Sequence, residues 1–234
     1  YLALIGNALI VFGPIVSIFN FYLCNIPQLV IVFVAAAFFY LLSTCLTSAF
    51  YFIPGIVNLP YLLVSIGVSI QEIFRFALFL AYLFTERGYE RNLKVKLLYG
   101  KFAWLHASVA AGLGFATCHA LLLNGNVLSQ SYGPGTLYLP NCPTITYFTH
   151  HSITTLLFVL LNISWMIIGF QGYIKKSVLR IISLLVLHFA ASLITVLNNK
   201  KDSCLYVLPT LASLVVIGAI ISTVELIIIC NKDE

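Results

Sequence analysis

Long apolar runs set the fold of this chain. Of its 234 residues, 61% are hydrophobic and only 8% are charged, whereas soluble domains carry about 25% charged residues. A helix needs about 20 apolar residues to cross the hydrocarbon core of a bilayer, while strands of membrane barrels have about 9–11 residues and alternate in polarity. The runs reach helical length without alternation, so the sequence predicts an all-α membrane protein.

The apolar runs are seven in number and cover most of the chain. We expect residues 1–234 to form one integral membrane domain, a bundle of seven transmembrane helices. Most connections between the runs are short, so successive helices should pack antiparallel. The predicted spans are about 2–23, 29–53, 60–84, 98–123, 145–172, 178–197 and 205–230.

Basic residues gather on one side of the predicted bundle. Nine of the 12 Lys and Arg residues lie in or beside the segments that follow spans three, five and seven; only Lys200 and Lys201 lie on the other side, and Arg75 is inside a span. Cytosolic loops carry the excess of Lys and Arg. The N-terminus is therefore predicted to be lumenal or extracellular and the C-terminus cytosolic. The net charge of +5 reflects this topology, and no nucleic-acid partner is expected.

Three strongly polar side chains interrupt the third run: Gln71, Glu72 and Arg75. A charged side chain at the centre of a bilayer costs about 2.5–3.5 kcal/mol on insertion scales. Glu72 and Arg75 are three residues apart and so share one helical face. One interpretation is an intrahelical ion pair that only lowers this cost. The other is a polar intramembrane anchor that reaches neighbouring helices or a buried hydrophilic cavity.

The fourth span is rich in small residues at helical spacing. Small side chains let the backbones of membrane helices approach each other closely. We therefore predict that this span packs tightly against neighbouring helices. The predicted packing residues are Ala107, Ser108, Ala111, Gly112 and Ala116.

Two further polar residues lie inside later spans, Asn162 in the fifth and His188 near the middle of the sixth. A lone membrane histidine is usually a hydrogen-bonded packing residue. The polar groups on spans three and five favour a polar cavity that Asn162 and His188 would share. We expect no metal site and no cofactor, because the adjacent His150 and His151 would diverge by about 100° on a helix.

Cys142 and Cys204 would both lie in loops on the lumenal side. Disulfides form in that oxidising environment, so the sequence predicts that these two cysteines can form a disulfide.

The order of these features resembles the anterior-pharynx-defective family, whose members are the seven-span scaffold subunit of gamma-secretase. The most specific part is the segment 71–77, Gln-Glu-Ile-Phe-Arg-Phe-Ala, which a basic loop follows. The small-residue fourth span, Gly133-Pro134-Gly135 and Leu187-His188 add to the likeness. Two positions depart from the family pattern. Its Gly-xxx-Gly in span four becomes Ala and Ser variants, and the first of its two membrane histidines falls on Asn162.

The resemblance implies a scaffold without catalytic residues of its own. Such a subunit binds nicastrin, presenilin and the presenilin enhancer subunit within membrane lipid, in the endoplasmic reticulum, the Golgi and the plasma membrane. It would support the processing of single-span substrates such as Notch. Aspartyl proteolysis inside a membrane needs two embedded Asp residues, and the only Asp residues here, Asp202 and Asp233, lie outside the predicted spans.

Two other classes of protein are alternative interpretations. The family is distantly similar to glutamate-type intramembrane proteases that process prenylated proteins, which carry paired acids and later histidines. Here Gln71 replaces one acid and Asn162 one histidine, which leaves Glu72 and His188 to activate a water. A seven-helix receptor or photoreceptor is the third class, and the seventh span has no Lys that could hold a retinal Schiff base.

Overall fold

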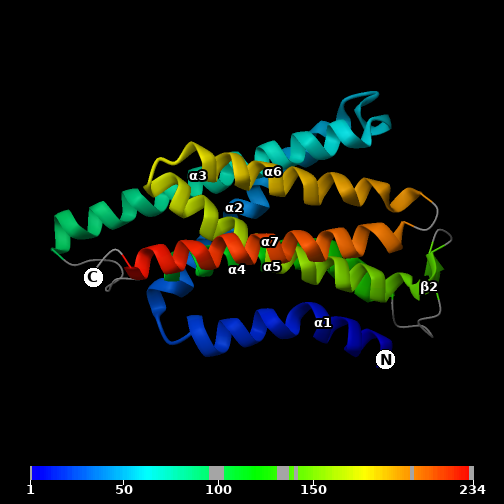
Figure 1. Ribbon diagram of the computed structural model, residues 1–234, viewed down its shortest axis with the longest axis horizontal. Helices are drawn as coiled ribbons and strands as arrows, with labels where there is room; N and C mark the ends of the chain where they lie inside the picture. The colour runs from blue at the N-terminus through cyan, green and yellow to red at the C-terminus, as the bar shows by residue number, and fades with distance from the viewer. Residues whose placement is uncertain (1, 95–102, 131–136, 140–141, 201–202, 232–234) are drawn as a thin grey trace.

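The computed structural model describes residues 2–94, 103–130, 137–139, 142–200 and 203–231 (Figure 1). Within these ranges seven long helices confirm the predicted all-α fold. Each is long and apolar enough to cross a bilayer, and the chain is an integral membrane protein. The helices are α1 (Leu2–Ile18), α2 (Pro27–Ala49), α3 (Pro60–Leu93), α4 (Ala103–Gln130), α5 (Tyr147–Ile174), α6 (Val178–Thr195) and α7 (Cys204–Asn231).

Several helices have ends that differ from those of the predicted spans. α3 continues to Leu93 and α4 to Gln130, whereas the spans were predicted to end at 84 and 123. Hydropathy marks where a helix leaves the hydrocarbon, and the helix itself continues into water. α1 ends at Ile18 and passes into η1, a π-helical segment over Phe19–Leu23. Residues 98–102 of the predicted fourth span lie outside the described residues.

Local sequence explains where the helices begin. Pro27 and Pro60 open α2 and α3, where a backbone N–H would have no partner within the helix. The Thr146 side chain caps α5 by accepting the backbone N–H of Thr149 at 3.3 Å. Between α2 and α3 the chain passes through two 3₁₀ turns, η2 (Phe50–Phe52) and η3 (Ile56–Asn58). They are joined through Gly55, whose φ of 89° suits glycine.

Helices α4 and α5 form the centre of the bundle. In the most apolar stretch of α4, 61% of the residues are buried, and in that of α5, 67% are buried. In the other five spans the share of buried residues is 17–39%. α4 packs against α2 and α5, and α5 also contacts α6, α7 and α1. In Figure 1, α1 lies below this centre, and α3 and α6 run side by side above it. The outer helices therefore leave wide apolar faces exposed to lipid or to other proteins.

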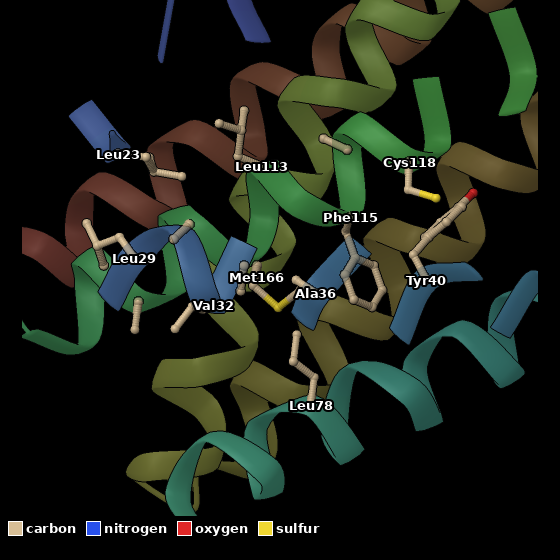
Figure 2. Close-up of a cluster of buried hydrophobic side chains, with 14 of the residues drawn as sticks. Leu23, Leu29, Val32, Ala36, Tyr40, Leu78, Leu113, Phe115, Cys118 and Met166 are labelled. Carbon is tan, nitrogen blue, oxygen red and sulfur yellow. The ribbon is translucent and has the colours of Figure 1, made fainter. Parts of the chain in front are cut away.

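Small residues of α4 let its neighbours approach closely. A Cβ built on Gly112 would lie 2.7 Å from the Cα of Ile163 in α5, and one built on Gly114 would lie 2.9 Å from the Cβ of Ala36 in α2. Both distances are too short for a real side chain. Around these contacts lies a continuous apolar core, part of which Figure 2 shows, with Leu113 and Phe115 of α4 set against side chains of α2, α3 and α5.

A short hairpin precedes α5. β1 (Tyr138–Leu139) pairs antiparallel with β2 (Cys142–Thr146), with Leu139 opposite Cys142. The backbone N–H of Tyr147, the first residue of α5, donates to the carbonyl of Leu137 at 2.8 Å. The hairpin is thus tied to the start of α5, at the end of the bundle where α6 meets α7 (Figure 1).

Candidate functional site

Glu72 and Arg75 are buried together on one face of α3. Arg75 has no exposed surface and Glu72 is 7% exposed. Arg75 Nε lies 3.2 Å from Glu72 Oε1, which makes an ion pair although the N–H is not aligned for a hydrogen bond. The spacing of three residues dictates this pairing, because it places both side chains on the same side of the helix.

His188 of α6 forms a hydrogen bond with the same carboxylate oxygen of Glu72. Its Nδ1–H donates to Glu72 Oε1 at 2.5 Å, and the ring is 2% exposed. Trp165 of α5 packs against the imidazole in a tilted arrangement, with ring centroids 4.1 Å apart. Glu72 therefore joins α3 to α6, and Trp165 fixes the imidazole against α5.

Arg75 is surrounded by groups from α4 and α5. Its Nη2 donates to Asn162 Oδ1 over a long 3.5 Å, and Asn162 Nδ2 donates to the carbonyl of Phe158 at 2.9 Å. The guanidinium carbon lies 5.2 Å from the ring centroid of Phe115 and 5.7 Å from that of Trp165, within the range of cation–π attraction. The Arg75 guanidinium thus contacts side chains of its own helix α3, of α4 and of α5.

Several polar atoms of this cluster have no hydrogen-bond partner among the described residues. They are Glu72 Oε2, Arg75 Nη1 and Trp165 Nε1. Buried polar groups normally find partners. Gln71, the other polar residue of the motif, is half-buried and lies near the Tyr40 hydroxyl of α2. The structure therefore brings Glu72, Arg75, Asn162 and His188 into one cluster and sets Gln71 beside it.

A groove of about 560 Å³ opens beside the cluster, between α3 and α6. Glu72 lies in its wall, and apolar side chains such as Phe76 and Leu185 make up most of the rest. Glu72, which is 7% exposed, is the member of the polar cluster that lines this groove.

A second polar contact was not among the predicted site residues. Tyr40 of α2 and His119 of α4 share a hydrogen bond of 2.7 Å between the hydroxyl and Nδ1, and the imidazole stacks on Phe158 of α5. A tyrosine in an apolar run carries no sequence signal for such a contact, since its partner lies 79 residues away. The Tyr40–His119 pair therefore links α2 to α4 and, through Phe158, to α5.

The five small residues predicted to pack in span four are all buried. Gly112 meets the backbone of α5, and Ala107, Ala111 and Ala116 belong to the core shared with α1 to α3 and α5. Their close contacts are made within this chain.

Cys142 is disulfide-bonded and almost fully buried. The side chain of Cys204, its predicted partner, lies outside the described residues, so the pairing stays a prediction.

The seven membrane-spanning helices and the buried Glu72–Arg75–His188 cluster define a polytopic membrane protein whose helices α3 and α6 are linked by buried ionic contacts. Comparison with known proteins then identifies the kind. The model of the family described as "Aph-1 protein" matches residues 2–226, and the chain belongs to this family.

The relatives carry consistent names. A protein of Drosophila melanogaster named gamma-secretase subunit Aph-1 is 30% identical, over 84% of this chain and 81% of its own length. Gamma-secretase subunit APH1-like of Arabidopsis thaliana is 29% identical, over 88% and 86%. The human gamma-secretase subunit APH-1B is 28% identical, over 83% and 78%.

Proposed function

We propose that the chain is a subunit of a gamma-secretase complex and acts in it as a scaffold. The observation that carries the proposal is the family match over nearly the whole chain, together with relatives from plants, insects and vertebrates that are named as subunits of that complex. A scaffold role suits a helix bundle that is held together internally and in whose five outer spans only 17–39% of the residues are buried.

The proposed partners are presenilin, nicastrin and the presenilin enhancer subunit. The proposed locations are the endoplasmic reticulum, the Golgi and the plasma membrane. In this proposal the chain stabilises presenilin and nicastrin, and the complex cleaves single-span substrates such as Notch.

We further propose that the chain supplies no catalytic residue. Glu72 is the acid at the centre of the cluster, and its Oε1 already faces Arg75 and His188. A carboxylate held between two donors is a weak base toward water. The next acids of α3, Glu86 and Glu90, lie at least 14 residues further along the helix, about 21 Å at 1.5 Å per residue. This geometry argues against the glutamate-protease alternative.

The test is co-purification. The tagged chain is expressed in its native host, extracted in a mild detergent and captured, and the membrane proteins that come with it are identified by mass spectrometry. We expect homologues of presenilin and nicastrin. Their absence, with cleavage of a membrane peptide by the chain alone, would contradict the scaffold proposal and favour a protease.

A further inference from the structure

A small cavity lies between the start of α2 and the second half of α3, and no residue of the Glu72 cluster lines it. Its volume is about 110 Å³. Ile31 and Leu78 are among its apolar side chains, and Gln28, Thr85 and Tyr89 are polar side chains that line it too. The three polar residues are exposed. The cavity therefore combines an apolar interior with polar groups at its mouth, which is the usual composition of a small-molecule site.

The polar and apolar groups of the cavity are separated in depth. Gln28 is the second residue of α2, and Thr85 lies just beyond residue 84, where the third apolar span was predicted to end. Ala35 lies seven residues further into α2 than Gln28, and Leu78 lies seven residues before Thr85. At 1.5 Å per residue each separation is about 10 Å. In the predicted orientation the mouth is therefore at the cytosolic interface and the apolar end is in the hydrocarbon, as in a membrane amphiphile.

The mouth of the cavity suits an uncharged polar group. Every described side chain that lines the cavity is uncharged. Arg87 comes two residues after Thr85, so it lies about 200° round the helix and away from the cavity. Arg91 stands in the same relation to Tyr89. Phosphate headgroups are bound most strongly by Arg and Lys, so the amide and hydroxyl groups of the mouth match a ligand with a neutral hydroxyl better than a phospholipid.

The walls of the cavity suit a rigid body. Ala35 and Ala81 contribute one small side chain from each helix, and the ring of Tyr82 is a further part of the lining. Small side chains leave room for a broad molecule to contact α2 and α3 together. A fused-ring sterol has little conformational freedom to lose on binding, whereas an acyl chain is ordered at a cost in entropy. The segment 80–87 also contains Leu, Tyr and Arg in the order of a motif for cholesterol contact.

We propose that the α2–α3 cavity binds a membrane sterol from the cytosolic leaflet. The sterol hydroxyl lies at the mouth, where the Gln28 amide and the Tyr89 hydroxyl can bond it, and the ring system lies against Ala35, Ala81 and Leu78. The site is separate from the Glu72 cluster, and sterol binding goes beyond the proposed scaffold function.

Photo-labelling tests the proposal. The purified full chain is reconstituted in phosphatidylcholine nanodiscs with a cholesterol analogue that carries a diazirine on its ring system, and labelled peptides are mapped by mass spectrometry after irradiation. Ala81→Phe fills the cavity, and Leu80→Phe, at the neighbouring position whose side chain is 48% exposed, is the matched control. Gln28→Leu removes the amide at the mouth and leaves the walls intact. A phosphatidylcholine with a diazirine in its acyl chain is used in parallel.

We expect labelled peptides from residues 28–35 and 78–89, and excess unlabelled cholesterol should abolish their labelling. The yield should fall about tenfold in Ala81→Phe and about threefold in Gln28→Leu, and it should stay unchanged in Leu80→Phe. Three results would overturn the proposal: labelling spread evenly over the outer helices, labelling that cholesterol does not compete, and equal labelling of the same peptides by the phosphatidylcholine probe.

The unfolding midpoint of each variant shows whether it folds. An unchanged yield in a folded Ala81→Phe chain, or in Gln28→Leu, would also refute the sterol site. If Ala81→Phe does not fold, Gln28→Leu decides alone, because Gln28 is exposed and its replacement leaves the packing of α2 against α3 in place.

Discussion

At the scale of single residues, the buried charges of α3 are held by unequal partners. Glu72 has a close hydrogen bond to His188 and an ion pair with Arg75. Arg75 relies on that ion pair, on two aromatic faces and on a long contact to Asn162. Removing either charge leaves the other buried, whereas removing Asn162 leaves both charges paired. The two kinds of substitution should therefore have very different effects.

Arg75→Ala should destabilise the bundle by roughly 3–5 kcal/mol, because Glu72 would remain buried without its counter-charge. Asn162→Ala should cost no more than about 1–2 kcal/mol, the range of single hydrogen bonds between membrane helices. The measurement is the thermal unfolding midpoint of the purified chain in detergent, followed by tryptophan fluorescence. Similar small shifts for both variants would show that the Glu72–Arg75 pair is not what holds α3 in place.

At the scale of helices, α4 is set apart by how closely its backbone approaches α5. At Gly112 a methyl group would meet the Cα of Ile163 at 2.7 Å and the carbonyl of Asn162 at 3.2 Å. Both are backbone atoms and cannot rotate away, so α4 and α5 would have to separate. Gly125, on the same helix, has no atom within 4 Å of the corresponding position.

Gly112→Ala is expected to lower stability by about 1–3 kcal/mol, the usual effect of overpacking. Gly125→Ala should be neutral or should raise stability by about 0.5–1 kcal/mol, since alanine favours the helix over glycine. The unfolding midpoints of both variants in the same detergent decide the matter. If the two substitutions act alike, the close approach of α4 to α5 is not a determinant of stability.

The sequence predicted the helices better than their partners. Hydropathy alone places seven spans, and the spacing of Glu72 and Arg75 predicts that they share a face. The polar residues of spans three, five and six predict a shared polar cavity. The sequence does not predict the specific contact between His188 and Glu72, 116 residues earlier in the chain, because that contact depends on how α3 and α6 pack. The Tyr40–His119 hydrogen bond and the contact of Trp165 with His188 also depend on how the helices pack.

At the scale of the whole molecule, the two ends of the bundle differ chemically. The connection between α5 and α6 carries Lys175 and Lys176, and the extended end of α3 carries Arg87 and Arg91. At the opposite end of the bundle lies the hairpin with the disulfide-bonded Cys142 (Figure 1). Positive charge favours the cytosol and disulfides favour the lumen or the exterior. Both features support the orientation predicted from sequence.

The predicted disulfide can be tested by mapping. Peptides that contain Cys142 and Cys204 should be recovered as one linked species after proteolysis without reduction. Cys24, Cys45 and Cys118 are free thiols and should instead be alkylated under denaturing, non-reducing conditions, which makes them internal controls. Recovery of Cys204 as an alkylated thiol would show that Cys142 has another partner.

Orientation itself predicts which loops enter the lumen. A flexible glycosylation-acceptor segment inserted after Lys200, between α6 and α7, should be glycosylated when the chain is expressed in eukaryotic cells. The same segment inserted after Lys94, beyond the end of α3, should stay unmodified. The readout is a shift in gel mobility that a deglycosylating enzyme removes. The two sites lie at opposite ends of the bundle. Glycosylation at the Lys94 site with none at the Lys200 site would therefore show that the true topology is the inverse of the predicted one. The extended end of α3 would then face the lumen, and the basic residues would no longer account for the orientation of the chain.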